Sequence, residues 1–505
     1  MIETRVIVGS GPCAVAATHA LLERGFEVIM LDAGETLDQG KSNIVARMAS
    51  QEPEQWVDAD KAVIQRVGFD SGDAVSPKRV FGSDYAYFVD PKVDAPSAMR
   101  LYGSRAFGGL SVVWGCALIK AASAELSGWP TEVSDAVVKC YPQIRDLIKM
   151  SIGADILAEG THLRISAAAK AVWDRHRRSQ TSHKDIDVYP TPLAIATECK
   201  ACNACMYGCV YRYSYSSRIT VEDIFARNPL FRYVGGVIVE SFEERSGGVE
   251  VRGTNTQDGS QYVLFGRQLF LAAGMIASLR ILWKSSRVIS RELVASDSAL
   301  FLIPGLCFSG DWGTDKHHGL AHLSVDLQSP PFETKPVHIQ LYFNNPAVAD
   351  GLEQRVSPFR TRPLRKLINL ANRIVVAGQG YLHSDYCHQL KLRCDNDGRI
   401  HASVVHNPDT DNYIDTALSH FTKKMRKFGL YFPKGAASVT RYGGSKTAGA
   451  LPHALEAGPS TTDLLGRPFQ SDNVFVVDTT VMPSMLARNV TLTAMANALR
   501  IGQAA

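Results

Sequence analysis

The chain has 505 residues, enough for two large structural units or for one enzyme with interleaved domains. Its composition, 45% hydrophobic and 21% charged, is that of a soluble globular protein. The formal net charge of +4 is too small to indicate a nucleic-acid partner, and no run of roughly 18 apolar residues offers a membrane span. The sequence enters a strand without a basic and apolar signal segment, so we expect a cytoplasmic protein.

The stretch RVIVGSGPCAVAATHALLERGFEVIMLDAG at 5–34 is typical of a strand, a helix and a second strand. Gly9 and Gly11 follow the first strand, where they permit a tight turn and a close approach to a pyrophosphate. Ala14 is small enough for the helix to pack closely on the strand, and Asp32 has the spacing of an acid that binds a ribose hydroxyl. The stretch therefore predicts dinucleotide binding, with NAD and FAD both open.

Three further segments repeat a glycine-rich or strand-to-helix pattern. They are YGSRAFGGLSVVWGCAL at 102–118, QLFLAAGMIASLRIL at 268–282 and NVFVVDTTVMPSMLARNVTLTAMANALRIG at 473–502. The glycines beside Ser111 and Trp114 favour backbone that lies against a flat ligand. The second segment breaks into a helix at Ala273, and the third contains a strand ending at Asp478 and a helix over 491–501.

Together, these segments resemble the glucose–methanol–choline family of FAD-dependent oxidoreductases. The matching positions are Gly9, Gly11, Ala14, Asp32, Ala33 and Gly34, the GGxSxxWG segment Gly108–Gly115, the LAAG segment Leu271–Gly274, and the tail from Val476 through Ala496. The motifs lie near both ends of the chain and occur in family order. The resemblance implies an α/β fold, in which a doubly wound, Rossmann-like FAD-binding domain is interleaved with an α+β substrate domain built on an antiparallel sheet.

The resemblance also implies how the chain is divided and what it does. The expected FAD-binding parts are 1–119, 220–299 and 455–505, and the expected substrate-domain parts are 120–219, with the cysteine-rich loop, and 300–454. The expected activity is oxidation of a CH–OH group of an alcohol, sugar or glycoside, with hydride transfer to flavin N5. Electrons would pass to an acceptor other than NAD, such as a quinone or a cytochrome. The alternatives are an oxidase that uses O₂ directly and a flavin-binding protein without alcohol-oxidising activity.

The family's cofactor contacts transfer to matching positions of this chain. They are Gly9, Gly11, Ala14, Asp32, Ala33, Gly108, Gly109, Ser111, Trp114, Gly115, Ala273, Asp478 and Asn489. In members with covalently attached FAD, a histidine precedes the tryptophan of the GGxSxxWG segment. Val113 holds that position here, so we expect FAD to be bound non-covalently. The helix that follows Asn489 would place a positive dipole near the reduced ring.

Alcohol oxidation needs a group that accepts the hydroxyl proton, and this chain departs from the family at that point. Asn489 fits the family's second active-site position, but Arg441 stands where the first histidine belongs. An arginine stays protonated at neutral pH, although its charge can bind an anion or lower the pKa of a substrate hydroxyl. His453 is one candidate base, and the alternatives are another histidine or a departure from histidine-based chemistry. Other candidates in the expected substrate domain are His317, His318 and His322.

The stretch CKACNACMYGC holds four cysteines in the C-x₂-C-x₂-C-x₃-C spacing of bacterial ferredoxins. A cluster would take Cys199, Cys202 and Cys205, and either Cys209 or a remote thiolate as its fourth ligand. The loop resembles that of bacterial FAD glucose and fructose dehydrogenase catalytic subunits, in which an iron–sulfur cluster relays electrons from the flavin. A structural loop over the flavin, a zinc site and redox-active thiols remain alternatives.

The segment 355–373 carries six basic residues and no aspartate or glutamate, with apolar residues on one helical face. A basic amphipathic helix of this kind can lie on an anionic membrane. It can also be a helix packed on its own domain with a solvated face. Peripheral membrane contact would suit a lipid-linked substrate or a quinone acceptor.

Overall fold

The computed structural model describes residues 3–65, 78–97, 99, 101–157, 164–179, 184–308, 316–345, 374–443 and 446–505. The basic segment 355–373 therefore lies outside the described residues. Within them, no helix is both long enough and apolar enough to cross a bilayer.

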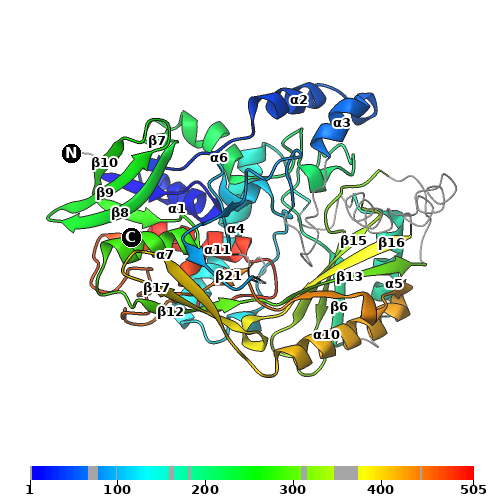
Figure 1. Cartoon of the computed structure of the whole chain (residues 1–505). Helices are drawn as coiled ribbons and strands as arrows, with labels where there is room; N and C mark the ends of the chain where they lie inside the picture. Colours follow the sequence, from blue (N-terminus) through cyan, green and yellow to red (C-terminus); the bar gives the residue numbers. More distant parts are fainter. Residues whose placement is uncertain are drawn as a thin grey trace.

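A five-stranded parallel sheet forms one half of the described structure (Figure 1). Its strands, in spatial order, are β22 (Val474–Val476), β11 (Gln268–Leu271), β1 (Thr4–Val8), β2 (Glu27–Leu31) and β7 (Phe231–Val234). The chain runs outward from β1 to β7 and then crosses to β11 and β22. The strand order therefore reverses between β1 and β11, and the crevice at the carboxyl ends of these strands is the place where doubly wound sheets bind ligands.

Each face of this sheet is covered by a different layer. Ile7 and Phe270 point to the layer of α1 (Pro12–Glu23), α4 (Thr131–Ile152) and α11 (Thr491–Ala504). Val8 and Leu271, the next residues along each strand, point to the opposite layer. That layer contains α7 (Met275–Ser285) and the antiparallel strands β8 (Val237–Arg245), β9 (Gly248–Asn255) and β10 (Gln261–Gly266). Both faces are apolar, as a buried parallel sheet requires.

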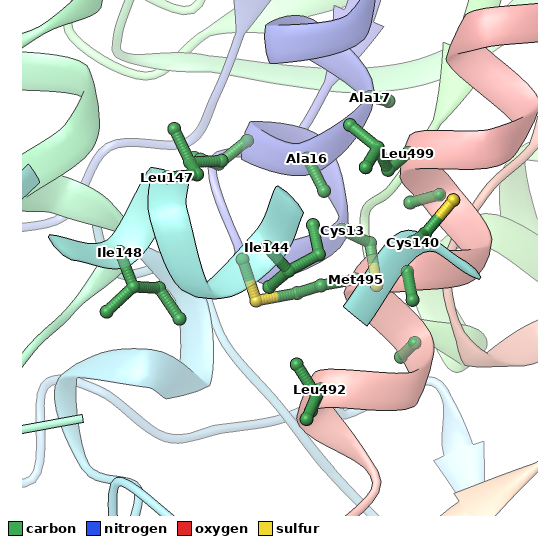
Figure 2. Close-up of a cluster of buried hydrophobic side chains, with 14 of the residues drawn as sticks. Cys13, Ala16, Ala17, Cys140, Ile144, Leu147, Ile148, Leu492, Met495 and Leu499 are labelled. Atoms are coloured by element: carbon green, nitrogen blue, oxygen red, sulfur yellow. The ribbon is translucent and has the colours of Figure 1, made fainter. Parts of the chain in front are cut away.

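Small residues let the helices of the first layer approach closely (Figure 2). Ala16 and Ala17 of α1 share one apolar cluster with Leu499 of α11 and Ile144 of α4. A Cβ atom added at Gly502 would lie 2.9 Å from the carbonyl oxygen of Ala17. Helix α11 thus packs directly on α1, the helix that follows the first strand of the parallel sheet.

A seven-stranded antiparallel sheet forms the other half of the described structure (Figure 1). Its strands are β19 (Leu430–Tyr431), β13 (Leu300–Cys307), β16 (Val375–Tyr381), β15 (Val337–Phe343), β14 (Leu323–Leu327) and β6 (Ile186–Pro190), with β20 (Ser438–Thr440) paired to β13. Helices α5 (Ala167–Arg178) and α10 (Thr410–Met425) cover its apolar face. The other face carries polar side chains, because residues alternate between faces along a strand.

The remaining elements complete the chain around these two sheets. They are the strands β21 (Thr447–Ala448), β12 (Glu292–Asp297), β17 (Gln389–Cys394), β18 (Ile400–Val405) and β4 (Val93–Asp94) of a third sheet, the pair β3 (Phe88–Val89) and β5 (Tyr102–Gly103), and the helices α2 (Gln39–Ala49), α3 (Asp58–Ile64) and α6 (Ser217–Asp223). Helix α4 belongs to the stretch expected in the substrate domain, yet it packs on α1 and α11. The predicted fold class is confirmed, whereas the predicted residue boundaries of the two domains remain a prediction.

Candidate functional site

A tight turn at the end of β1 depends on Gly9. Its φ of +101° lies in the region that favours glycine, and a Cβ atom there would lie 2.5 Å from the carbonyl oxygen of Ala272. Helix α1 begins at Pro12, directly after Gly11, which caps it without a side-chain hydrogen bond. The first turn of α1 contains no acidic residue. Its free N–H groups and positive dipole end therefore face the crevice and are available to an anion.

The segment Gly108–Gly115 lies against this turn. A Cβ atom at Gly109 would lie 3.0 Å from Cα of Gly11, so two glycine backbones pack directly on each other. Ser111 accepts a hydrogen bond from the backbone N–H of Ser217 at 2.9 Å. Trp114 donates its indole N–H to the carbonyl oxygen of Tyr215 at 2.7 Å. The serine and the tryptophan thus fasten the segment to the chain around α6 and leave its backbone to face the crevice.

Asp32 stands at the end of β2, where the sequence predicts an acid that binds ribose. Its carboxylate accepts hydrogen bonds from the hydroxyl groups of Ser10 at 2.6 Å and Tyr233 at 3.0 Å. The Ser10 hydroxyl oxygen in turn accepts from the backbone N–H of Gly108 at 2.8 Å. Burial raises the pKa of Asp32 to about 6, although these hydrogen bonds oppose the shift. The carboxylate is therefore held in one orientation at the edge of the crevice.

Asp478, just after β22, connects two of the segments in which the sequence predicts cofactor contacts. Its carboxylate accepts hydrogen bonds from the backbone N–H of Gly274 at 2.9 Å and from the hydroxyl group of Ser278 at 2.6 Å. It also accepts from the backbone N–H of Thr480 at 3.0 Å. The side chain of Asp478 thus ties the end of β22 to the N-terminus of α7, beside Ala273. The carboxylate therefore stabilises the position of these two segments at the crevice.

These features fit a dinucleotide. Gly9 and Gly109 pack directly on the backbone of Ala272 and Gly11, and the first turn of α1 offers uncapped N–H groups. Asp32 lies at the end of the neighbouring strand. Ala14 is buried behind the turn, where α1 packs on the sheet. The chain therefore brings together the glycines and the acid that the sequence predicts for cofactor binding.

The polar side of the seven-stranded sheet presents the other part of the candidate site. Its residues, which lie on four adjacent strands, are Tyr189 of β6, Ser324 and Asp326 of β14, His338, Gln340 and Tyr342 of β15, and Gln379 and Tyr381 of β16. We call this set the polar face. Phenols, amides, a carboxylate and an imidazole side by side offer hydrogen-bond donors and acceptors to a polar ligand.

The two halves of the described structure meet at Asn489. Gln340 of the polar face donates a hydrogen bond to the side-chain oxygen of Asn489 at 3.1 Å. Tyr342 donates to the side-chain oxygen of Gln340 at 3.2 Å. A Cβ atom at Gly115 would lie 4.0 Å from the Tyr342 hydroxyl. The predicted cofactor segment, the predicted catalytic asparagine and the polar face therefore adjoin one another, and we call this place the junction.

A buried ion-pair network lies beside the junction. Asp326 contacts the Nδ1 atom of His338 at 2.8 Å and the guanidinium of Arg488 at 2.7 Å. It also accepts a hydrogen bond from the hydroxyl of Tyr189 at 3.0 Å, and Arg488 pairs with the fully buried Glu125 at 3.4 Å. Burial alone would raise the pKa of Asp326, but His338 and Arg488 lower it below its usual range. The network links the polar face to the chain that enters α11.

Lys446 is a further residue at the junction. Its ammonium group donates hydrogen bonds to the carbonyl oxygens of Ala487 at 3.0 Å and Arg488 at 3.3 Å. The same group lies 3.5 Å from the centre of the Tyr381 ring. Burial lowers the pKa of Lys446 to about 7. The sequence prediction missed this lysine, although its presence in TRYGGSKTAGALPH, the segment that resembles the family's histidine segment, was an available signal.

Arg441 does not lie at the junction, so the prediction of a catalytic role for it is not supported. Its guanidinium is half exposed and pairs with the exposed carboxylate of Asp411, at the start of α10. The short strand β20 ends at Thr440 and pairs with β13, at the edge of the antiparallel sheet. Arg441 follows directly after this strand and is directed to solvent.

His453 is buried, but it is held by structural contacts. Its Nδ1 atom lies 2.8 Å from the carbonyl oxygen of Asp463. Its Nε2 atom contacts Asn497 and Arg500 of α11. Burial and the nearby Arg500 charge lower the pKa of His453 to about 3. Both ring nitrogens are engaged by protein groups, which favours a structural role over that of a base.

The histidines of the KHHGLAH segment are also held by the chain. The Nε2 atom of His322 and the Nδ1 atom of His317 lie 2.8 Å and 2.9 Å from the carbonyl oxygen of His318. The Nδ1 atom of His322 lies 3.4 Å from the hydroxyl of Ser166, and that of His318 accepts from the backbone N–H of Leu320 at 3.3 Å. Burial lowers the pKa of His318 to about 3. These contacts favour neutral structural histidines.

The cysteine-rich loop packs against the antiparallel sheet. The Sγ atom of Cys205 accepts a hydrogen bond from the backbone N–H of Gly319 at 3.4 Å. Asn203 donates to the carbonyl oxygen of Asn344, just beyond β15, at 2.9 Å. Burial raises the pKa of Cys202 to about 11 and that of Cys205 well above its usual range. Burial therefore favours the neutral thiol over the thiolate that binds metals.

The iron–sulfur cluster predicted from these cysteines is not supported. Across the described residues, no group of three or more histidine, cysteine, aspartate or glutamate side chains is arranged to hold a metal ion. The four predicted ligands, Cys199, Cys202, Cys205 and Cys209, lie close enough to influence one another's charge, but they are not gathered around a common centre. The interpretation that fits these contacts is a structural loop that closes the polar face beside β15.

Known proteins resemble this chain in fold rather than in sequence. No protein-family model matches it, and no curated protein matches its sequence. Among solved structures, it resembles the crystal structure of pyridoxine 4-oxidase from Mesorbium loti, with a TM-score of 0.62 and 13% sequence identity. The likeness covers 99% of this chain and 98% of that chain. At this identity it shows a shared fold over the whole chain.

Proposed function

We propose that the chain is an FAD-dependent oxidoreductase that acts on the CH–OH group of a polar substrate. The observation that carries the proposal is the junction, where Gln340 of the polar face contacts Asn489 and Tyr342 of the same face lies beside Gly115. A dinucleotide in the crevice and a substrate on the polar face would then share one site. The fold shared with a pyridoxine 4-oxidase agrees with this class of reaction.

The residues of the crevice would hold the cofactor. The turn at Gly9 and Gly11 and the free N–H groups of α1 suit the pyrophosphate, and Asp32 suits a ribose hydroxyl. A bound flavin supplies an acceptor for the hydride of the substrate's C–H bond. Val113 rather than a histidine precedes Trp114, and we propose that the cofactor is bound non-covalently.

The residues of the junction would hold the substrate. The amides of Asn489 and Gln340 can each donate and accept a hydrogen bond, which suits a hydroxyl group. Helix α11 begins directly after Val490, has no acidic residue in its first turn and has no side-chain cap. Its positive end therefore stabilises negative charge that develops near Asn489. His338, Gln340 and Tyr342 are buried, and electrostatic interactions are stronger where little water is present.

Anaerobic reduction of protein purified with bound flavin tests the proposal. We expect the visible absorption to bleach when alcohols, sugars, glycosides and hydroxymethyl-substituted rings are added, one at a time. Bleaching by at least one donor supports the proposal, and bleaching by none of a broad panel contradicts it. Admission of air to the reduced protein then distinguishes an oxidase, which reoxidises at once, from a dehydrogenase that needs a quinone, a cytochrome or another carrier.

A further inference from the structure

His338 differs from the histidines described above. It is fully buried on β15, its Nδ1 atom lies 2.8 Å from the carboxylate of Asp326, and its Nε2 atom has no hydrogen-bond partner among the described residues. A buried polar atom without a partner costs stability, and such atoms in native structures call for an explanation. A ligand bound at the polar face would explain an unpaired imidazole nitrogen there.

The partners of the ring fix the position of its proton. A carboxylate only accepts hydrogen bonds, so the proton of neutral His338 sits on Nδ1, and Nε2 carries a free lone pair. By contrast, the Nε2 atom of His453 contacts Asn497 and Arg500, and the donor groups of Arg500 occupy its lone pair. An imidazole whose far nitrogen is oriented by a carboxylate has the arrangement of a general base.

Two other buried histidines have an unpaired nitrogen among the described residues. His176 of α5, whose Nδ1 atom is unpaired, contacts the Phe428 ring on the apolar side of the antiparallel sheet. The Nε2 atom of His383, in the turn after β16, also has no partner among the described residues. Its Nδ1 atom accepts a hydrogen bond from the backbone N–H of Asp385 at 3.2 Å. The same Nδ1 atom also lies 3.2 Å from the half-exposed carboxylate of Asp385. Only His338, of these three, lies on the polar face.

The position of His338 places this lone pair near the junction. Gln340, which contacts Asn489, lies two residues further along the same face of β15, roughly 7 Å away along the strand. Asp326 also binds Arg488, which precedes Asn489 in the chain. We infer that Nε2 of His338 accepts the hydroxyl proton of the substrate, and that Asp326 is a positioning residue for this base. The inference rests on the proposed function and names a base for it.

The step itself is a proton transfer. The O–H bond of the substrate breaks, an N–H bond forms at Nε2, and the electron pair stays on the substrate oxygen. The imidazolium that forms is stabilised by Asp326, whose second oxygen remains paired with Arg488. No electron leaves the substrate in this step, so it needs no oxidant of its own.

This arrangement accounts for the departure at Arg441. The family's histidine is absent from that position, and Arg441 itself is a surface partner of Asp411. The antiparallel sheet supplies an imidazole instead, from a strand rather than from the C-terminal segment.

The ionisable groups around the pair of His338 and Asp326 are Asp187, Tyr189, Glu125, Tyr381, Lys446 and Arg488.

The variant His338→Gln tests the assignment in flavin-loaded protein. We expect bound flavin to stay at the wild-type level, and the anaerobic rate of flavin reduction by the best donor to fall roughly 10²–10⁴-fold, the usual contribution of a general base. The matched control is His383→Gln, because His383 is equally buried and also lies beside an aspartate, Asp385. The control should keep the wild-type rate per bound flavin.

Two further measurements separate a base from a structural histidine. Added imidazole should restore part of the rate in His338→Gly and none in a variant whose defect is misfolding. Nitrogen NMR of protein labelled in histidine should show His338 with its proton on Nδ1 in the wild type, and a changed proton position in Asp326→Asn. This second readout needs neither substrate nor turnover.

The outcomes distinguish the two proposals. If no donor reduces the flavin of the wild-type protein, the proposed function is overturned, and the assignment of His338 as its base is overturned as well. A wild type that is reduced, with His338→Gln as fast per bound flavin, overturns the assignment of His338 and leaves the function standing. A large loss of rate in His383→Gln alone, or a proton on Nε2 of His338 in the wild type, also overturns the assignment.

Discussion

The two sheets of this chain present their chemistry by opposite means. At the carboxyl ends of the parallel sheet, the crevice is shaped by backbone: Gly9 and Gly109 pack directly on the backbone of Ala272 and Gly11, and α1 offers uncapped N–H groups. On the antiparallel sheet, side chains provide the contacts, and the amide of Gln340 and the imidazole of His338 lie on one face of one strand. A backbone cradle suits a ligand that is always the same, whereas a face of side chains suits a ligand that differs between enzymes.

This contrast predicts different sensitivities to substitution. The turn at Gly9 should fail when even a methyl group is added. The polar face should keep its fold when one side chain is replaced by another of similar size. It should lose activity or stability when the replacement removes a charge or a lone pair. Four variants test that difference, beginning with the one of largest expected effect.

Arg488→Met should destabilise the protein strongly. It leaves Asp326 and Glu125 buried without their cation, and breaking a buried ion pair on one side costs about 3–5 kcal/mol. Urea unfolding at neutral pH measures the loss, with flavin saturation held constant. A change below about 1 kcal/mol would show that the network between the polar face and the entrance to α11 is not a structural joint.

Gly9→Ala should weaken cofactor binding. The added Cβ atom would lie 2.5 Å from the carbonyl oxygen of Ala272, and a φ of +101° is strained for alanine by about 1–3 kcal/mol. Because about 1.4 kcal/mol is a tenfold change in affinity, we expect at least a tenfold weaker binding of FAD, measured by titration of flavin-free protein. The control Gly25→Ala also has positive φ, +78°, but its Cβ atom would meet nothing within 4 Å. An equal loss of affinity in both variants would contradict a specific role for the turn at Gly9.

These variants also mark what the sequence could and could not predict. Gly9, Gly11 and Asp32 were predictable because the motif is local: a strand, a turn and a helix within 34 residues fix their relation. His338 could not be placed from sequence, since its partner Asp326 is on another strand and its task depends on the register between β14 and β15. The periodicity of VHIQLYF predicts a strand, but does not show which ligand its polar residues face.

The misplaced residues have a similar cause. His453 stands near a family motif in sequence, yet the chain between β21 and β22 folds back onto the C-terminal half of α11, where Asn497 and Arg500 engage the ring. The spacing of Cys199 to Cys209 is that of a cluster loop, but a local pattern cannot show whether four thiols converge. Long-range packing decides both cases.

Lys446→Met should change how stability depends on pH. The pKa of this lysine is about 7 in the folded chain and 10.5 as an ordinary lysine, so between these values the unfolded chain holds a proton that the folded chain lacks. The free energy of unfolding of the wild type should therefore gain up to about 1.4 kcal/mol per pH unit from this group as the pH rises through that window. The variant should lack this contribution.

Urea unfolding of both proteins at several pH values within this window measures the difference. The difference between the two unfolding free energies should shift steadily in favour of the wild type as the pH rises. Parallel curves for wild type and Lys446→Met would show that the buried amine keeps its ordinary affinity for protons.

Arg441→Met should have the smallest effect. The side chain is half exposed, and its contact with the exposed Asp411 is of a kind that contributes about 0–1 kcal/mol. We expect an unfolding free energy within that range of the wild type, and an unchanged anaerobic rate of flavin reduction. A large fall in that rate, with normal flavin content, would show that Arg441 takes part in the reaction and would contradict its assignment as a surface residue.

A CH–OH donor on the polar face should reduce a flavin held in the crevice, and the other expectations depend on this reaction. The most direct test is a single anaerobic turnover of flavin-loaded protein with excess donor, in which reduced flavin and carbonyl product are both quantified. We predict one carbonyl product for each flavin reduced. Flavin reduction without a carbonyl product, or a carbonyl product formed while the flavin stays oxidised, would contradict the proposed chemistry.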